Sequence, residues 1–175
     1  MGQSFPGKRT KANTIRAINP IDCIGYSNVI LVCGTNDLRV ENLKEAGALH
    51  QLVDVLALKI KQIKELCPRT KLFVPAVLPS RLYGMNKNIV AFNRLVGEML
   101  HRNFGQSVWH LGVGHFLDNR GLLAMALTRN GDEIHLGNHG IAKFVRCVKH
   151  WVFVRERQER ARHGKPNQPV GVYPT

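Results

Sequence analysis

The sequence predicts an α/β protein in which helices cover a parallel β-sheet. Short apolar runs rich in β-branched residues alternate with long amphipathic segments, an order that is typical of doubly wound α/β folds. The 175 residues suffice for one domain, and a hydrophobic fraction of 44% can supply its core. Ligands bind this class of fold at the carboxyl ends of the strands, so polar residues that follow the strands are candidates for a functional site.

The individual elements follow from the spacing of the apolar residues. Strands are predicted at residues 28–34, 71–79 and 107–113, and Pro75 argues that the second is not paired along its whole length. Apolar residues at three- and four-residue steps predict helices at residues 42–67, 88–104 and 140–160. The side chains expected on their inner faces are Leu49, Leu52, Val53, Leu56, Ile60 and Ile63 in the first, Ile89, Phe92, Val96, Met99 and Leu100 in the second, and Ile141, Phe144, Val145, Val148, Trp151 and Val152 in the third.

The distribution of charge sets the C-terminal part of the chain apart. We expect one domain over residues 1–154 and a basic, proline-containing tail over residues 155–175. The formal net charge of +13 favours a polyanionic partner such as nucleic acid. A solubilising or linker role is an equally good interpretation, because charge alone carries no sequence or shape readout. The candidate nucleic-acid contacts are Arg155, Arg157, Arg160 and Arg162.

Other features bear on where the protein works and what it binds. No apolar run reaches the roughly 18 residues of a membrane-spanning helix, and the first residues lack the apolar centre of a secretory signal. We therefore expect an intracellular protein, cytoplasmic or nuclear, whose four widely spaced cysteines are free thiols. No metal and no cofactor is predicted, because the histidines lack the spacing of metal ligands. The histidines considered are His110, His115, His135 and His139.

Two short polar motifs lie where this fold class places its ligands. The first, "GTND" at residues 34–37, directly follows the first strand; there Asn36 can present its amide to a developing oxyanion, and Gly34 lets the backbone come close. The second, "GDEIH", precedes the last helix, and its spacing lets Asp132 orient the imidazole of His135 as a general base. Alone, "GDEIH" is better explained by a capping Asp and a surface His, whereas "GTND" is equally well explained as a polar turn with a helix cap.

Together and in this order, the motifs resemble blocks of the SGNH hydrolase family, the GDSL-type esterases and lipases. The segment "LVCGTNDLR" is similar to the Asn block of the family, and "DEIHLGNHGIAKF" is similar to its last block. The segments "SFPGKRT" and "VPAVLPSR" resemble the Gly block and a strand with its loop in the esterase-like domains of some retrotransposon and viral proteins. The resemblance covers residues 5–151 and implies a flavodoxin-like, three-layer α/β/α sandwich with a mainly parallel sheet.

The resemblance also implies a reaction and the residues that perform it. Gly7 and Asn36 would donate hydrogen bonds to the oxyanion, Asp132 would orient the histidine, and His135 would act as general base. The implied reaction is the hydrolysis of small esters or acyl groups through a serine ester.

The block that supplies the serine of this family, Gly-Asp-Ser at the end of its first strand, has no counterpart here. Only six residues precede Gly7, too few for that strand and the following helix, so we expect the first strand to be missing from a truncated domain. Ser4, Ser27 and Ser80 lack the strand–turn setting of a nucleophile. We therefore expect an inactive or incomplete esterase; the alternative is a nucleic-acid-associated accessory module of a mobile element or virus that uses its basic termini.

Overall fold

A parallel three-stranded sheet forms the centre of the fold. The computed structural model describes residues 15–130 and 132–162. Its strands are β1 (Asn28–Ile30), β2 (Lys71–Pro75) and β3 (Val108–Leu111), in the order β1-β2-β3. Both pairs are parallel, with Val29 opposite Leu72 and Val74 opposite His110. The sequence prediction of a parallel sheet is thus confirmed.

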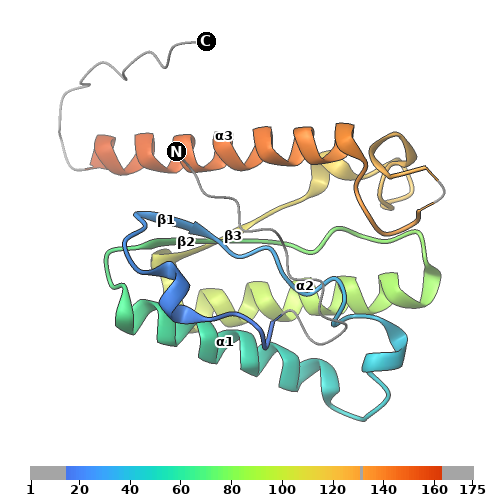
Figure 1. Ribbon diagram of the computed structural model, residues 1–175, viewed down its shortest axis with the longest axis horizontal. Helices are drawn as coiled ribbons and strands as arrows, with labels where there is room; N and C mark the ends of the chain where they lie inside the picture. The colour runs from blue at the N-terminus through green and yellow to red at the C-terminus, as the bar shows by residue number, and fades with distance from the viewer. Residues whose placement is uncertain (1–14, 131, 163–175) are drawn as a thin grey trace.

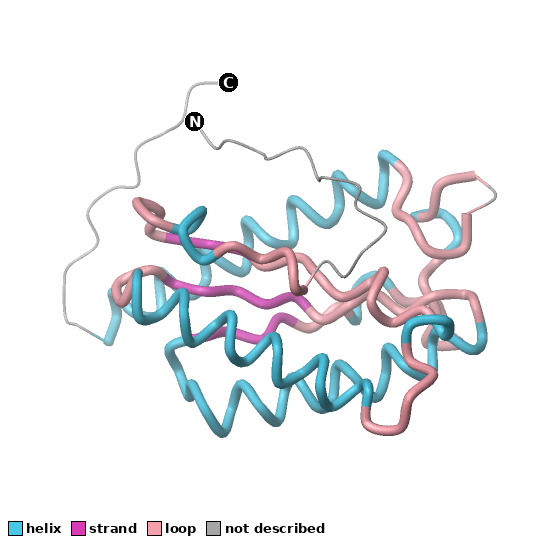
Figure 2. The backbone as a smooth tube through the Cα atoms, turned by 60° about the horizontal axis from the view of Figure 1, so that its bottom comes forward, coloured by secondary structure: helices cyan, strands magenta, loops and turns pink. Residues whose placement is uncertain are grey.

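Helices cover both faces of this sheet and make three layers. Helices α1 (Ala48–Leu66) and α2 (Tyr83–Phe104) lie on one face, and α3 (Asn138–Arg162) lies alone on the other (Figure 1). Figure 2 shows the strands between these two helical layers, with long loops leaving the ends of the strands. Short 3₁₀ helices complete the described elements: η1 (Pro20–Cys23), η2 (Val40–Asn42), η3 (Gly105–Ser107), η4 (Gly114–Phe116) and η5 (Met125–Leu127). The α/β/α class is confirmed.

The main core lies between the sheet and the α1–α2 layer. The apolar stripe predicted for α2 is buried throughout, and five of the six side chains predicted for α1 are buried, while Leu49 is partly exposed. They pack with Leu72, Val74 and Val108 of the sheet. Periodic burial of this kind is the main source of helix stability in a globular protein.

Two helices begin at other residues than predicted, and a local turn precedes each of them. Helix α1 begins at Ala48 rather than at residue 42, because Gly47 has a left-handed φ of 83° and Asn42 donates its side-chain amide to the carbonyl of Asn36 (2.7 Å). Helix α2 begins at Tyr83 rather than at residue 88, because the hydroxyl of Ser80 accepts a hydrogen bond from the backbone N–H of Leu82 (3.0 Å) and starts the turn.

All three strands are shorter than predicted. Beyond β2, Asn93 bonds both the N–H and the carbonyl of Val77, each at 2.8 Å. Pro75 is the last residue of β2, in keeping with its missing N–H. Beyond β1, Gly34 turns the chain with a φ of 102°. The strand ends therefore open into loops that carry polar residues.

Helix α3 packs less completely than its sequence suggests. Of the six apolar side chains predicted to face inward, only Val148 is buried, and Ile141 and Val145 are 50% and 45% exposed. Its first half packs on a second core formed by the loops that follow β3, around Phe116 and Leu123. This arrangement leaves one flank of α3 open beside the sheet.

The second half of α3 is held to the sheet by polar contacts. Glu156 accepts a hydrogen bond from the amide of Asn28 (3.2 Å), and Glu159 forms an ion pair with Lys71. The helix thus runs to Arg162, close to the end at residue 160 that the apolar spacing predicts, and its last turns are the first residues of the predicted basic tail.

The structure also bears on two simpler properties of the chain. Within the described residues, none of the helices combines the length and the apolar character that crossing a bilayer would require. The four cysteines are free thiols; Cys23 and Cys67 are buried, and Cys33 and Cys147 are partly exposed.

Candidate functional site

Asp132 and His135 form a close pair on the loop that leads into α3. Nδ1 of His135 lies 2.6 Å from Oδ2 of Asp132. The other oxygen, Oδ1, accepts hydrogen bonds from the backbone N–H groups of Ile134 and His135, each at 2.8 Å. One carboxylate therefore shapes the turn and orients the imidazole at the same time.

The protonation of the pair follows from these contacts. The backbone N–H of His135, then that of Ile134, and then the imidazole stabilise the carboxylate and lower the pKa of Asp132 to about 2. At neutral pH Asp132 is therefore ionised and can only accept, so Nδ1 of His135 carries the proton. Nε2 is left as the ring nitrogen that can accept a proton from a reacting group.

Two glycines allow the loop to lie against the start of α3. A Cβ atom on Gly140 would lie 2.2 Å from the carbonyl oxygen of Leu127, and one on Gly137 would lie 2.8 Å from that of Thr128. The backbone N–H of Gly137 donates to the same Leu127 carbonyl at 2.9 Å. The segment "HLGNHG" thus needs glycine for close packing at both positions.

The loop that follows β2 is hydrogen-bonded to the turn that carries Asp132 and His135, and so braces it. Ser80 Oγ and the backbone N–H of Arg81 both donate to the carbonyl of Glu133, at 3.3 and 3.1 Å. The sequence raises Ser80 only as a possible nucleophile and does not predict this bracing role. The only signal for it was the position of "PSR" after the second strand.

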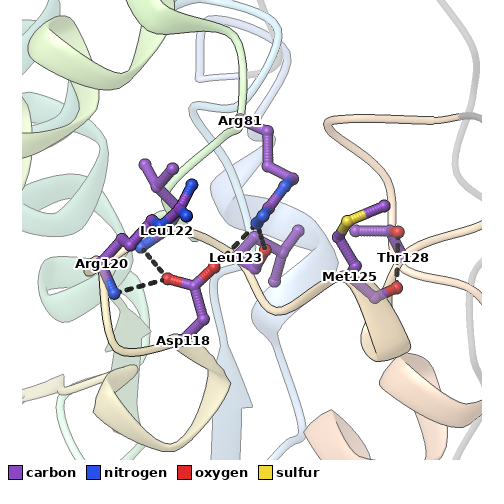
Figure 3. A network of polar contacts seen from close by, with 7 residues as sticks. All are labelled: Arg81, Asp118, Arg120, Leu122, Leu123, Met125 and Thr128. Atoms are coloured by element: carbon purple, nitrogen blue, oxygen red, sulfur yellow. Dashed lines mark hydrogen bonds and ion pairs between the residues drawn. The ribbon is translucent and has the colours of Figure 1, made fainter.

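The brace extends into a network of polar contacts on the loop after β3 (Figure 3). Arg81 forms an ion pair with Asp118 at 2.8 Å and donates to the carbonyl of Leu123 at 3.2 Å. Asp118 also accepts hydrogen bonds from the backbone N–H groups of Leu122 and Arg120. These bonds, that of Leu122 most of all, hold the pKa of the Asp118 carboxyl below its usual range. Arg81 therefore links this loop to the turn that carries the Asp132–His135 pair, which we call the dyad.

The "GTND" turn presents Asn36 at the end of β1. Gly34 is buried, and a Cβ atom there would lie 3.0 Å from Val77 Cγ2, so both its φ and its packing favour glycine. Asp37 turns inward and accepts from the backbone N–H of Ile15 at 3.3 Å. Asn36 is exposed, and its backbone carbonyl is held by Asn42. The inward turn of Asp37 thus leaves the Asn36 side chain on the surface of the turn.

Asn36 and His135 line one hollow at the carboxyl ends of the strands. Its volume is about 350 Å³. The other lining residues are mostly apolar or small: Val32, Cys33, Thr35, Pro75, Ala76, Val77, Leu78, Ile134, Leu136, Ile141 and Phe144. The structure thus brings the two predicted motifs together at the edge of the sheet where this fold class binds ligands. A small acyl group would meet apolar walls, an amide donor and an imidazole there.

No serine among the described residues lies in this hollow. Ser27 precedes β1 and Ser107 precedes β3, at the opposite edge of the sheet, and the hydroxyl of Ser80 is engaged in the brace. Cys33 lines the hollow, but burial, and next the charge of Asp37, raise the pKa of its thiol to about 12, which keeps it protonated. Thr35 lines the hollow as well and was not considered in the sequence analysis.

The remaining predicted residues divide between two places. Gly7 and Ser4 lie outside the described residues. Arg155, Arg157, Arg160 and Arg162 all lie on the last turns of α3, far along the helix from the loop of the dyad. Arg155 is partly buried and donates to Gln158 at 3.1 Å, whereas Arg157 and Arg160 are exposed.

Comparison with solved structures shows which proteins share this fold. A Streptococcus pneumonia protein described as a platelet activating factor is 21% identical, with a TM-score of 0.60, over 71% of this chain and 59% of the other. A carbohydrate esterase of family 3 from Talaromyces cellulolyticus is 12% identical, with a TM-score of 0.55, over 85% of this chain and 66% of the other. The chain thus spans less than two thirds of the length of each.

These likenesses establish the fold and nothing finer. The three-layer arrangement with its parallel sheet is consistent with the flavodoxin-like fold of SGNH hydrolases. No protein-family model matches the sequence, and no curated protein matches it significantly. Function therefore has to be argued from the residues of the site.

Proposed function

We propose that this chain carries the general-base and oxyanion half of an SGNH-type site for the hydrolysis of small esters or acyl groups. The observation that carries the proposal is the 2.6 Å contact of Asp132 and His135 beside the hollow that His135 shares with Asn36. Asp132 fixes the tautomer, His135 moves the proton, and Asn36 donates to the oxyanion.

The chemistry is acyl transfer to a serine followed by hydrolysis. The serine oxygen bonds to the acyl carbon while Nε2 of His135 takes the hydroxyl proton, and the side-chain amide of Asn36 stabilises the negative charge on the carbonyl oxygen. The ester bond then breaks, and the leaving alkoxide receives the proton from His135. Water repeats the same two steps on the serine ester and releases the acid.

No serine among the described residues lies in the hollow, where Thr35 is the one residue with a hydroxyl group, so we propose that the serine comes from outside the described residues. The hydroxyl groups of Ser27, Ser80 and Ser107 are remote or engaged, and the Cys33 thiol is held protonated. As the resemblance to esterase-like domains of retrotransposon and viral proteins implies, the site would then form part of a larger polypeptide. The described residues then hold only part of an esterase site.

Hydrolysis of p-nitrophenyl acetate tests whether the site is incomplete. We expect the chain and its His135→Ala variant to hydrolyse the ester at the same background rate. A faster rate that is lost in His135→Ala would show a working nucleophile within the 175 residues and would contradict the proposed incompleteness. The Ser4→Ala variant would then show whether Ser4 is that nucleophile.

Binding of acetate and butyrate, the acid products of short ester hydrolysis, tests the site independently of turnover. We expect both to shift the NMR signals of the His135 ring and of the Asn36 side-chain amide, and Asn36→Ala to weaken binding. Asn130→Ala removes an exposed amide from the loop that carries Asp132 and is the matched control. Absence of shifts, or equal weakening by the two variants, would contradict an acyl-binding site.

A further inference from the structure

The outer face of α3 carries a row of exposed basic side chains. Arg146, Lys149, His150, Arg157 and Arg160 recur at short intervals along the helix, and all are exposed. With Phe153 between them, they share one side of the helix, opposite the buried Val148. We call these six residues the α3 outer stripe; from its first to its last residue it is about 21 Å long at the 1.5 Å rise of an α-helix.

Both glutamates of α3 bind residues of the sheet. Residues 138–162 contain seven Lys or Arg and two Glu, a difference of five charges. Glu156 binds Asn28 and Glu159 binds Lys71, both residues of strands. Positive charge is therefore left in excess among the exposed side chains of α3.

The basic side chains of the α3 outer stripe take no part in the ion pairs of the described residues. Among the residues that the structure describes, none of these side chains forms an ion pair. Lys143 is different and is left out, because its ammonium group donates to the carbonyl of His115 and lies 5.4 Å from the ring centroid of Phe116. The stripe is thus an unneutralised surface rather than part of the packing of α3.

Phe153 adds an aromatic ring to this charged surface. It is 49% exposed and stands one turn from Arg157, with Lys149 and His150 one turn before it. An exposed ring among cations is the arrangement by which proteins stack bases while their basic side chains follow a phosphate backbone.

We propose that the α3 outer stripe binds single-stranded nucleic acid. Arg146, Lys149, Arg157 and Arg160 contact phosphates along its length, and Phe153 stacks on an unpaired base. The proposal concerns a surface on the far side of α3 from the sheet and does not depend on ester hydrolysis. The proposed set of nucleic-acid contacts differs from the one predicted from the sequence. Arg146 and Lys149 are added to Arg157 and Arg160, whereas Arg155 is left out because it lies on the side of α3 that faces the protein.

The composition of the stripe favours nucleic acid over an anionic membrane. A helix that lies in a membrane surface places a broad apolar face into the lipid. The apolar side chains Val148 and Trp151 of α3 instead face the protein, and Phe153 is the one large apolar residue of the stripe. A surface of this kind gains its affinity from phosphate contacts and counterion release.

The test is the affinity of the full chain for an oligouridylate of about 20 nucleotides, long enough for the stripe, measured by fluorescence anisotropy. The variant replaces Arg146, Lys149, Arg157 and Arg160 by Gln. We expect this variant to bind the oligouridylate at least about tenfold more weakly. We also expect the plot of log affinity against log salt concentration to become less steep by about 2.8, or 0.7 for each lost contact.

A control variant removes the same charge from the opposite layer. It replaces Lys44, Arg69, Lys87 and Arg102 by Gln, all of which are exposed and outside the ion pairs of the structure. Both variants carry a formal charge of +9, which is +13 minus four. We expect the control to bind nearly as well as the unmodified chain, and both variants to keep its circular dichroism spectrum and unfolding midpoint.

Phe153→Leu and Phe153→Tyr test the stacking contact. We expect the leucine variant to bind the oligouridylate about fivefold more weakly or worse, with an unchanged salt slope, and the tyrosine variant to retain affinity. Binding of an RNA duplex should be unaffected by either change, because its bases are already stacked.

Three results would overturn the proposal. Equal losses in the two charge variants would show that net charge rather than the stripe governs binding. No effect of Phe153→Leu on the single strand would remove the assignment to unpaired bases. Binding to phosphatidylserine vesicles that requires the stripe, without binding to RNA, would assign the surface to a membrane.

Discussion

Ser80 Oγ donates a hydrogen bond to the carbonyl oxygen of Glu133 across 3.3 Å, and so joins two loops that are 53 residues apart in the sequence. The same carbonyl accepts from the backbone N–H of Arg81 at 3.1 Å. Because Glu133 stands between Asp132 and His135, the orientation of that pair depends on the loop after β2 as well as on its own turn.

Removing the hydroxyl of Ser80 should make the orientation of the Asp132–His135 pair less fixed, although neither of these two residues is changed. We expect Ser80→Ala to lower the free energy of unfolding by about 1 kcal/mol, because a buried hydrogen bond is lost. It should also broaden or shift the low-field NMR signal of the His135 Nδ1 proton. Ser107→Ala loses a hydroxyl hydrogen bond to Phe104 at the other end of the sheet and is the control. An identical Nδ1 signal in wild type and Ser80→Ala would contradict the brace.

The ionisation of Asp132 should persist far into the acid range. Its pKa of about 2 lies below the value of about 3.9 in an unfolded chain. The carboxylate therefore stabilises the fold above about pH 4, and this contribution is lost as the pH falls through 2. A ¹³C NMR titration of the Asp132 carboxyl measures the midpoint directly.

His135→Ala separates the causes of this low pKa. The backbone N–H groups of residues 134 and 135 remain in that variant, so we expect the midpoint of Asp132 to rise only part of the way to its ordinary value. A full return to the ordinary value would mean that the imidazole, and not the backbone, is the main cause.

Gly140→Ala should destabilise the protein despite the higher helix propensity of alanine. The new Cβ would lie 2.2 Å from the Leu127 carbonyl oxygen and 2.8 Å from Leu136 Cδ2. We expect a loss of about 1–3 kcal/mol in the free energy of unfolding, measured by urea denaturation. Gly112→Ala adds the same atom where nothing lies within 4 Å and should change stability by less than about 0.5 kcal/mol. Equal effects of the two changes would contradict the packing argument.

Cys33 should behave as an inert thiol although it lines the hollow. Burial raises its pKa to about 12, so almost no thiolate exists at pH 8. We expect iodoacetamide to modify Cys33 in the folded protein many times more slowly than in urea, as followed by peptide mass spectrometry. Similar rates in the two conditions would show that the thiol is accessible and reactive and would reopen its role as a nucleophile.

Much of the fold could be predicted because it depends on local periodicity. The apolar stripes of α1 and α2 are buried nearly as predicted, since a repeat of three and four residues fixes one face of a helix. Helix and strand ends were less predictable. They depend on individual side-chain contacts, of Asn93 with Val77 and of Asn42 with Asn36, which the apolar periodicity does not encode.

The candidate site, like the fold, has a part that the sequence predicts and a part that it does not. Parallel strands predict that the segment after β1 and the loop before α3 meet at one edge, and Asn36 and His135 do line one hollow there. Their catalytic roles stay predictions, as does the role of Gly7. The brace by Ser80 and Arg81 could not be predicted, because it depends on where a long connection returns to the sheet.

The outer edge of β1 has a consequence for handling the protein. β1 pairs with β2 on one side only among the described strands; its last residue, Ile30, is 38% exposed, and Val32, which follows the strand, is 66% exposed. Residues 28–34 contain neither the lysine nor the proline that often protects such an edge. Molecules of charge +13 repel one another, which opposes contact between such edges, and salt screens that repulsion. Solubility should consequently fall as ionic strength rises, through growing strand-to-strand association.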